Sequence, residues 1–203
     1  DRKSGRRQRF FSSPDILRQI KAAIAKNPRI DHITFSGSGE PTLNTGIGDL
    51  IRKIKKMTDI PVVVLTNSSL LNRWSVRHAL LAADVVVPSL DAAAAATFRR
   101  VNRPLPSLKV ADIVGALAMF RREFKGRIWL EVMLVKGIND SPSDIEALKR
   151  AIARIRPDKV QLNTVVRPPA EKWAQPLSQR ELNKIKNSLG GRTEVVVEFR
   201  RRT

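Results

Sequence analysis

The sequence predicts an α/β fold in which parallel strands alternate with helices. Six short apolar segments of strand length recur along the 203 residues, and segments with apolar residues at helical spacing separate them. No turn signal of the hairpin type joins two successive strand segments. This order favours parallel pairing, either in an open doubly wound sheet or in a whole or partial (β/α) barrel.

The strand segments are rich in β-branched residues, and several are apolar without alternation. The run "PVVVLTN", which begins at Pro61, is an example. A short continuous apolar run of this kind is typical of a strand that is buried on both faces of a parallel sheet. The predicted strands cover residues 32–36, 61–67, 84–91, 127–135, 159–165 and 193–199.

The helical segments are recognised by their caps and by their apolar spacing. The first begins after Ser13, a suitable N-cap, and has Pro14 and Asp15 in its first turn. A segment containing "RVNRPLPS", residues 100–107, is predicted to be a loop. The later helices are expected at residues 48–57, 75–82, 110–124, 142–155 and 178–189.

Length and composition indicate one compact domain over residues 1–203, with a basic segment at 1–12 and a terminal strand and basic tail at 193–203. With 42% hydrophobic and 28% charged residues, the chain is neither disordered nor a membrane protein. No run approaches the roughly 18 apolar residues that span a bilayer. The cytoplasm is therefore the expected compartment, with no membrane partner.

The formal net charge of +19 makes nucleic acid a candidate partner, because it creates a positive potential over much of the surface. The alternative is a basic, soluble protein without such a partner, since the charge is spread along the chain. Only 5% of the residues are aromatic, which leaves few stacking platforms for unpaired bases.

Polar residues follow five of the predicted strands at their carboxyl ends. Any one of them could be ordinary turn chemistry or a helix cap. Because the carboxyl ends of parallel strands meet at one edge, however, the whole set predicts a binding site there. The set is Ser36, Ser38, Gly39, Glu40, Thr66, Asn67, Ser68, Ser89, Asp91, Lys136, Asn139, Asn163, Thr164 and Arg167.

The loop "SGSGEP", residues 36–41, is the most informative of these strand ends. It matches neither the dinucleotide-binding pattern nor a P-loop, since no third glycine and no Gly-Lys-Ser/Thr sequence follow. Gly37 and Gly39 permit close approach of a ligand to the backbone. Exposed backbone with one carboxylate, from Glu40, suits a ligand that carries an ammonium group.

Two residues of the fourth strand bear on the site. Glu131 lies between Leu130 and Val132, so that it faces either the barrel interior, as a site candidate, or the helix layer, as an ion-pair partner. Trp129, Trp173 and the loop "NTVVRPPAEKW", residues 163–173, are candidates to shape a pocket, although for Trp129 the favoured prediction is packing between strand and helix. The sequence contains no convincing catalytic triad or pair of acids.

Together, the segments "SGSGEPTLN", "LTNSSLL", "VVVPSLDAAAAATFRRVNRP", "WLEVMLVKGIND" and "VQLNTVVRPPAE" resemble the radical S-adenosylmethionine superfamily. They are most similar to its iron–sulfur oxidoreductases related to wyosine-type tRNA-modifying enzymes. The resemblance covers residues 10–199. It implies a partial (β/α)6 barrel that binds S-adenosylmethionine at the carboxyl edge of its strands.

The resemblance also implies roles for individual residues. Those that match the family's "GGEP" motif, with serine in place of the first glycine, would hold the amino group of the cofactor. Three others fall at strand ends that contact its ribose and carboxylate, and a looser group would face cofactor or substrate. These sets are, in turn, Ser38, Gly39, Glu40 and Pro41; Asn67, Ser89 and Asp91; and Lys136, Asn163 and Arg167.

One departure from the family is serious. Its chemistry needs three cysteines, in a C-x3-C-x2-C loop after the first barrel strand, to hold a [4Fe–4S] cluster. This sequence has no cysteine, so the 203 residues alone are not expected to catalyse the reaction and no residue is assigned a catalytic or metal-binding role. Either the chain is the remainder of a radical enzyme without its first strand and cluster loop, or it is a natural cysteine-free relative.

Three functions remain open at this point. The first is the core of a radical enzyme that, at full length, cleaves S-adenosylmethionine reductively to a 5′-deoxyadenosyl radical. Its electron donor would be a flavodoxin or ferredoxin, and tRNA is one candidate among unknown substrates. The second is a basic, non-catalytic nucleic-acid-binding module on the same scaffold. The third is a structural or interaction domain that has lost its cofactor.

Overall fold

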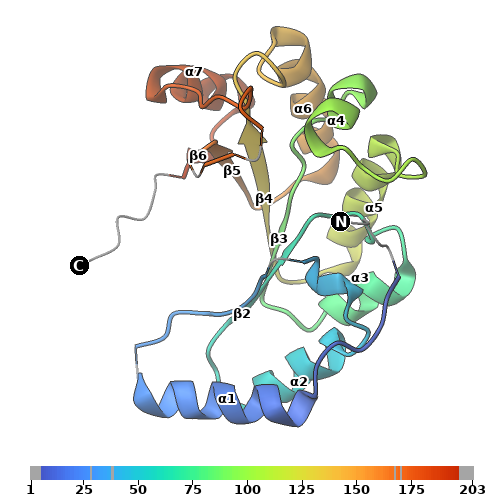
Figure 1. The fold of residues 1–203 in the computed structure, drawn as a ribbon, viewed down its shortest axis with the longest axis vertical. Coiled ribbons are helices and arrows are strands. Elements are labelled where there is room, and N and C mark those ends of the chain that lie inside the picture. Colours follow the sequence, from blue (N-terminus) through green and yellow to red (C-terminus); the bar gives the residue numbers. More distant parts are fainter. Residues whose placement is uncertain (1–5, 28, 38, 167, 170, 197–203) are drawn as a thin grey trace.

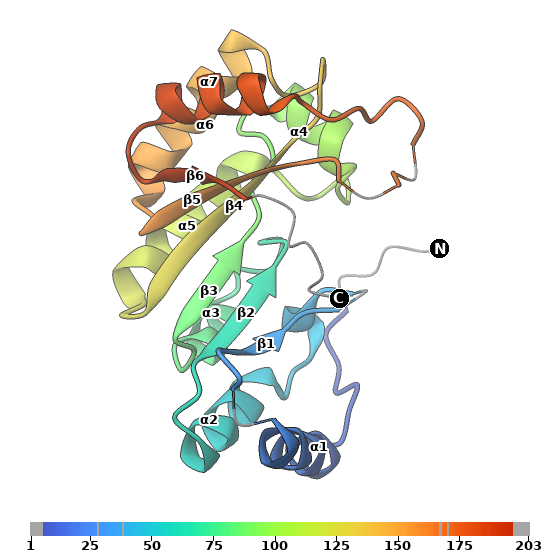
Figure 2. The same cartoon turned by 90° about the vertical axis from the view of Figure 1, so that its left-hand side faces the viewer.

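The computed structural model describes residues 6–27, 29–37, 39–166, 168–169 and 171–196. Within them, six parallel strands form one sheet in the order β1-β2-β3-β4-β5-β6. Helices cover one face of this sheet, and Figure 2 looks onto the other face with α3 and α5 behind the strands. The predicted α/β fold is confirmed, and the open sheet corresponds to a partial barrel.

The predicted strands are all present, and the first five are shorter than predicted by at least one residue. Residues 197–199 of the sixth lie outside the described residues. The strands are β1 Ile33–Phe35, β2 Val62–Thr66, β3 Val85–Pro88, β4 Arg127–Leu134, β5 Lys159–Thr164 and β6 Thr193–Val195.

Helices connect the strands and pack their apolar faces against one large core cluster. In Figure 1 the helices lie in roughly their chain order along the curved sheet, with α1 and α2 at the bottom and α6 and α7 at the top. The helices are α1 Ser13–Lys26, α2 Ile47–Met57, α3 Trp74–Leu80, α4 Ala95–Asn102, α5 Val110–Glu123, α6 Pro142–Ile155 and α7 Gln179–Leu189.

Helix α4 corrects the prediction of a loop at residues 100–107, because it extends to Asn102. It is only eight residues long and Phe98 is its one buried residue, so that it gives no apolar periodicity to recognise. Phe98 anchors the helix in the core, where it is buried. The helix ends at Arg103, whose φ of 44° lies in the left-handed region, immediately before Pro104.

Strand β4 shows which face of the sheet is covered. Leu130 and Val132 are buried in the core beneath the helices. Trp129 instead packs with Val63 and Val85 in a small second cluster on the opposite face. The prediction that Trp129 packs between strand and helix was therefore wrong, because alternate residues of a strand face opposite sides.

Helices α2 and α3 approach each other closely at Gly48. A β-carbon at this position would lie 2.9 Å from the Cα of Ala79 and 3.1 Å from its carbonyl oxygen. Both atoms belong to the backbone of α3 and cannot rotate away. The contact between the two helices therefore depends on a glycine at this position.

We expect Gly48→Ala to lower the free energy of unfolding by about 1–3 kcal/mol, since the added methyl group overpacks the contact with α3. The measurement is urea unfolding monitored by circular dichroism.

Gly115→Ala is the matched control, because this glycine also lies within a helix but the nearest atom to its added methyl group would be 3.9 Å away. It should raise the stability by about 0.5–1 kcal/mol through helix propensity. Equal stabilisation by both substitutions would contradict the account of the contact.

Candidate functional site

The carboxylate of Glu40 joins the loops that follow β1 and β2. Its Oε1 accepts hydrogen bonds from the backbone N–H of Thr42 at 3.0 Å and from the hydroxyl of Thr66 at 2.7 Å. Its Oε2 accepts from the backbone N–H of Asn67 at 2.6 Å. One side chain thus fixes two strand ends relative to each other.

The glycine loop that Glu40 holds presents backbone to its surroundings. Gly37 and Gly39 are exposed, and apart from their chain neighbours no described atom lies within 4 Å of the position where either would carry a β-carbon. A ligand can therefore approach the backbone of these two glycines closely. Pro41 begins a short 3-10 helix, Pro41–Leu43, and Ser38 lies outside the described residues.

The loop after β2 is shaped by turn hydrogen bonds. Asn67 is exposed, and its Oδ1 accepts from the backbone N–H of Ser69 at 3.0 Å, while its amide NH2 group donates to no residue that the structure describes. Ser68 has a φ of 66°, and its hydroxyl donates to the carbonyl of Ser89 at 2.9 Å. The ends of β2 and β3 are connected in this way.

Glu131 connects two of the predicted site residues across the sheet. Its Oε2 accepts from the hydroxyl of Ser89 at 3.3 Å, and its Oε1 accepts from the amide of Asn163 at 2.7 Å. It shares its face of β4 with Trp129, away from the helix layer. Of the two alternatives for Glu131, the structure selects the inward-facing one.

Asp91 lies at the end of β3 but is almost fully buried, with 8% of its surface exposed. Its carboxylate accepts from the backbone N–H of Met133 at 2.9 Å and from the amide of Asn102 at 2.7 Å. Burial raises the pKa of this carboxyl above its ordinary value. Its contact with a cofactor stays a prediction, since the protein's own donors occupy the carboxylate.

Asn139, another predicted strand-end residue, is completely buried and connects the loops after β3 and β4. Its amide donates to the carbonyl of Asp91 at 2.7 Å and to that of Met133 at 2.8 Å. Its Oδ1 accepts from the backbone N–H of Val135 at 2.7 Å. Asn139 therefore holds these two loops in place through backbone groups and is not itself accessible to a ligand.

Lys136 lies beside helix α7. Its ammonium forms an ion pair with Glu181 at 2.9 Å. The pKa of Glu181 is lowered to about 2, because its carboxylate accepts hydrogen bonds from the side chain and backbone of Ser178 as well as from Lys136. Arg167, the other basic residue predicted for this part of the site, lies outside the described residues.

Two supporting residues were missed by the sequence analysis. Thr42 is fully buried, and its hydroxyl donates to Glu40 at 2.6 Å. The available signal was its position two residues after the carboxylate, where side-chain capping of a turn is common. Asn102, the partner of Asp91, gave no signal because helix α4 was not expected.

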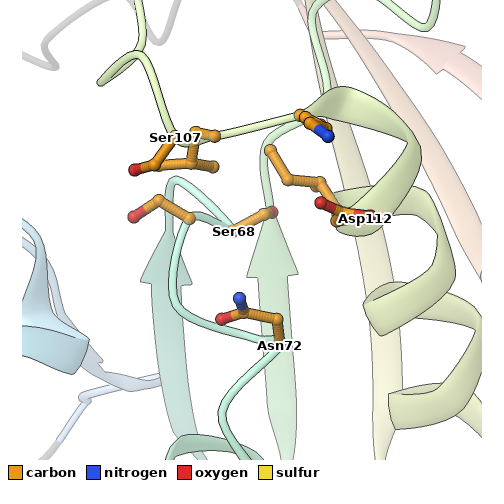
Figure 3. Close-up of a pocket in the computed structure, with 8 residues that line it drawn as sticks. Ser68, Asn72, Ser107 and Asp112 are labelled. Carbon is orange, nitrogen blue, oxygen red and sulfur yellow. The ribbon is translucent and has the colours of Figure 1, made fainter.

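A small hollow lies between the loop after β2 and the start of α5. Figure 3 shows the side chains of Ser68, Asn72, Ser107 and Asp112 around it. Its volume of about 30 Å³ admits one or two water molecules. It is too small for a nucleoside.

The sequence and structure were compared with known proteins. Residues 1–152 match the model of the Radical SAM superfamily, and the chain belongs to this family. It is 43% identical to a protein named GTPase Obg from Brachyspira hyodysenteriae, over 87% of this chain and 26% of that protein. It is 33% identical to the UPF0026 protein MJ1312 from Methanocaldococcus jannaschii, over 88% of this chain and 56% of that protein.

A weaker match, 25% identical over 86% of this chain and 52% of the relative, is to the dual-specificity RNA methyltransferase RlmN from Oleidesulfovibrio alaskensis. The chain thus spans about a quarter to slightly more than half the length of these three relatives.

Solved structures share the fold. A radical SAM methyltransferase from Sphaerobacter thermophilus superposes with a TM-score of 0.67 and 19% identity, over 92% of this chain and 57% of that one. SuiB from Streptococcus suis, solved with bound S-adenosylmethionine, gives a TM-score of 0.66 and 15% identity over 98% of this chain and 44% of that one. Both support the partial-barrel assignment.

The family implies a [4Fe–4S] cluster and S-adenosylmethionine, and each of them needs particular ligand residues. No residue in the sequence is a cysteine, and within the described ranges no three histidine or acidic side chains gather as a metal site would require. The residues present therefore do not fit a [4Fe–4S] cluster. The exposed backbone of Gly37 and Gly39 and the exposed amide of Asn67 are groups that can hydrogen-bond to a polar ligand.

None of the helices in the described part of the chain has the length and apolar character that a membrane crossing requires.

Glu40→Gln should lower the free energy of unfolding by about 1–3 kcal/mol, because an amide cannot accept hydrogen bonds on both sides and one donor is left unsatisfied. Urea unfolding at neutral pH measures the change. Glu146→Gln, on the exposed face of α6, is the control and should change stability by less than about 0.5 kcal/mol. Equal stability of both variants would show that Glu40 does not hold the loops together.

Proposed function

We propose that the complete protein is a radical S-adenosylmethionine enzyme, and that the residues described here bind the cofactor. The observation that carries the proposal is the exposed glycine loop, which Glu40 holds beside the exposed amide of Asn67. Backbone and amide groups are thereby arranged at the carboxyl edge of a radical SAM fold. Membership of the family makes S-adenosylmethionine the natural ligand for this edge.

The ammonium, carboxylate and ribose groups of the cofactor each have a suitable counterpart. Backbone carbonyls of the glycine loop suit its ammonium group, and the amide NH2 of Asn67 suits its carboxylate. The hydrogen-bonded row of Ser89, Glu131 and Asn163 offers donors and acceptors for ribose hydroxyls or for a substrate. In this proposal Glu40 acts by fixing the loop, and Asp91 acts by fixing the end of β3.

The iron–sulfur cluster must come from elsewhere in the protein. We propose that cysteine ligands lie outside these 203 residues, because the chain covers only part of its relatives and contains no thiolate donor. When bound, the cluster would supply the electron that cleaves S-adenosylmethionine to methionine and a 5′-deoxyadenosyl radical. A flavodoxin or ferredoxin would serve as electron donor, and the cytoplasm is the proposed compartment.

Cofactor cleavage is the test. The full-length protein is reconstituted anaerobically with iron and sulfide, reduced with dithionite in the presence of S-adenosylmethionine, and assayed for 5′-deoxyadenosine by chromatography. We expect product from the wild-type protein. Absence of cysteine ligands from the full-length sequence, or absence of 5′-deoxyadenosine from the reconstituted protein, would contradict the proposal.

Asn67→Asp tests the binding site within the same assay. The aspartate keeps the acceptor for the N–H of Ser69, but it replaces the amide donor with a negative charge. We expect the KM for S-adenosylmethionine to rise about tenfold or more. Asn187→Asp, an identical change on the exposed surface of α7, should leave the KM unchanged. Equal KM values for both variants would remove Asn67 from the site.

A second candidate function rests on charge. The net charge of +19 favours RNA as substrate or partner, and the similarity to RlmN, whose name describes an RNA methyltransferase, adds to this. Such a protein could modify RNA, with tRNA as one candidate, or bind nucleic acid without catalysis. Cofactor cleavage distinguishes the two.

Affinity for tRNA should fall steeply with salt, because phosphate contacts release counterions. Filter binding at about 50 mM and about 200 mM salt should show at least a tenfold loss. Absence of binding at the lower salt concentration, or an affinity that does not change with salt, would count against an RNA partner.

A further inference from the structure

A groove at the carboxyl edge of the sheet combines positive charge with an exposed aromatic ring. We name it the arginine groove. It has a volume of about 380 Å³ and is lined by Arg99, Arg100, Arg103, Ile138 and Trp173. Of these residues, only Trp173 was predicted to help shape a pocket.

The groove lies on the same side of the fold as the proposed cofactor site. Its arginines come from the end of α4 after β3, and Ile138 and Trp173 come from the segments after β4 and β5. Ser89 directly follows β3, and Glu131 and Asn163 lie on β4 and β5. Helix α4 stands at the upper end of the sheet in both views (Figures 1 and 2). A ligand in the groove would therefore lie next to the reactive edge.

The ring of Trp173 is exposed but held in place. It is 43% exposed, and the guanidinium carbon of Arg103 lies 5.6 Å from its centroid, which is within range of a cation–π contact. The guanidinium is fixed in turn by Glu171, whose Oε1 accepts from Nη1 at 2.7 Å. Because its orientation is set in advance, the ring can stack on a planar group with little loss of entropy.

Arg99 and Arg100 provide the positive charge of the groove. Both are exposed and lie in the last turn of α4, where the helix dipole favours cations. Neither forms an ion pair with any residue that the structure describes. Their guanidinium groups can therefore bind an anion without first breaking a salt bridge.

We propose that the arginine groove binds a single-stranded segment of RNA, with one base stacked on Trp173 and neighbouring phosphates on Arg99 and Arg100. Guanidinium groups match phosphate oxygens in a bidentate geometry, and exposed aromatic rings stack bases regardless of sequence. The volume is in the range of small-molecule sites and accommodates a nucleotide. An acidic peptide would use the arginines but would leave the exposed ring without a function.

The inference rests on the proposal that RNA is the partner of this protein, and it adds where the RNA binds. It also answers the objection that the chain has too few aromatic residues to bind unpaired bases. Although only 5% of the residues are aromatic, one correctly oriented ring beside two unpaired arginines is sufficient for one stacked base.

Fluorescence anisotropy with a labelled oligouridylate of about 12 nucleotides tests the groove. Trp173→Ala should weaken binding about tenfold, whereas Trp173→Phe, which keeps an aromatic ring, should bind nearly as well as the wild type. The double variant Arg99→Gln/Arg100→Gln should reduce the slope of log affinity against log salt by about 1.4, because two phosphate contacts are lost.

The control is Arg52→Gln/Lys56→Gln, which removes the same charge from the exposed side of α2 at the opposite end of the molecule. It should change the affinity less than twofold and leave the salt slope unchanged.

Three other outcomes would contradict the inference, and each excludes a different part of it. If the wild type binds no RNA, both the RNA partner and the groove are excluded, while cofactor cleavage is unaffected. If the wild type binds and the groove variants behave like the control, the groove alone is excluded. If a labelled polyglutamate binds more tightly than RNA and its affinity is independent of Trp173, the groove binds an acidic protein instead.

Discussion

The arrangement of the strand ends depends on the hydrogen bonds that the Glu40 carboxylate accepts. A single side chain on the loop after β1 accepts hydrogen bonds from two donors at the end of β2, the hydroxyl of Thr66, the last residue of the strand, and the backbone N–H of Asn67. Both loops would otherwise have unsatisfied polar groups at the edge of a buried sheet. With these groups paired inside the protein, the backbone of the glycine loop is left for a ligand.

The same edge is built up strand by strand through polar side chains. Ser68 connects β2 to β3, and Glu131 connects β3 to β5 through Ser89 and Asn163. Asn139 donates to the backbone carbonyl of Asp91 and so connects the loops that follow β3 and β4. The result is a set of polar contacts that connects the ends of β2, β3, β4 and β5. In our proposals, cofactor and RNA bind on this same side of the sheet, at the strand ends and in the arginine groove.

Much of the fold and of the polar edge could be predicted from the sequence, because the spacing of apolar residues indicates which faces of helices and strands are buried. The strands and most helices were evident from apolar spacing, and the polar strand ends followed from parallel pairing. Helix α4 was not, because it is short and Phe98 is its only buried residue, which gives no apolar periodicity. The face of Trp129 was misjudged although Glu131 is two residues away and must share it. The pairing of Asp91 with Asn102 could not be foreseen, since it depends on the position of that helix.

The central claim is that Glu40 positions the loop and that the loop backbone binds the cofactor. The most direct measurement is a crystal structure of the reconstituted full-length protein with S-adenosylmethionine. The account predicts that the amino group of the cofactor contacts the backbone of residues 37–39, while the carboxylate of Glu40 still accepts from the N–H of Asn67. A cofactor bound elsewhere, or a Glu40 carboxylate released from Asn67, would contradict it.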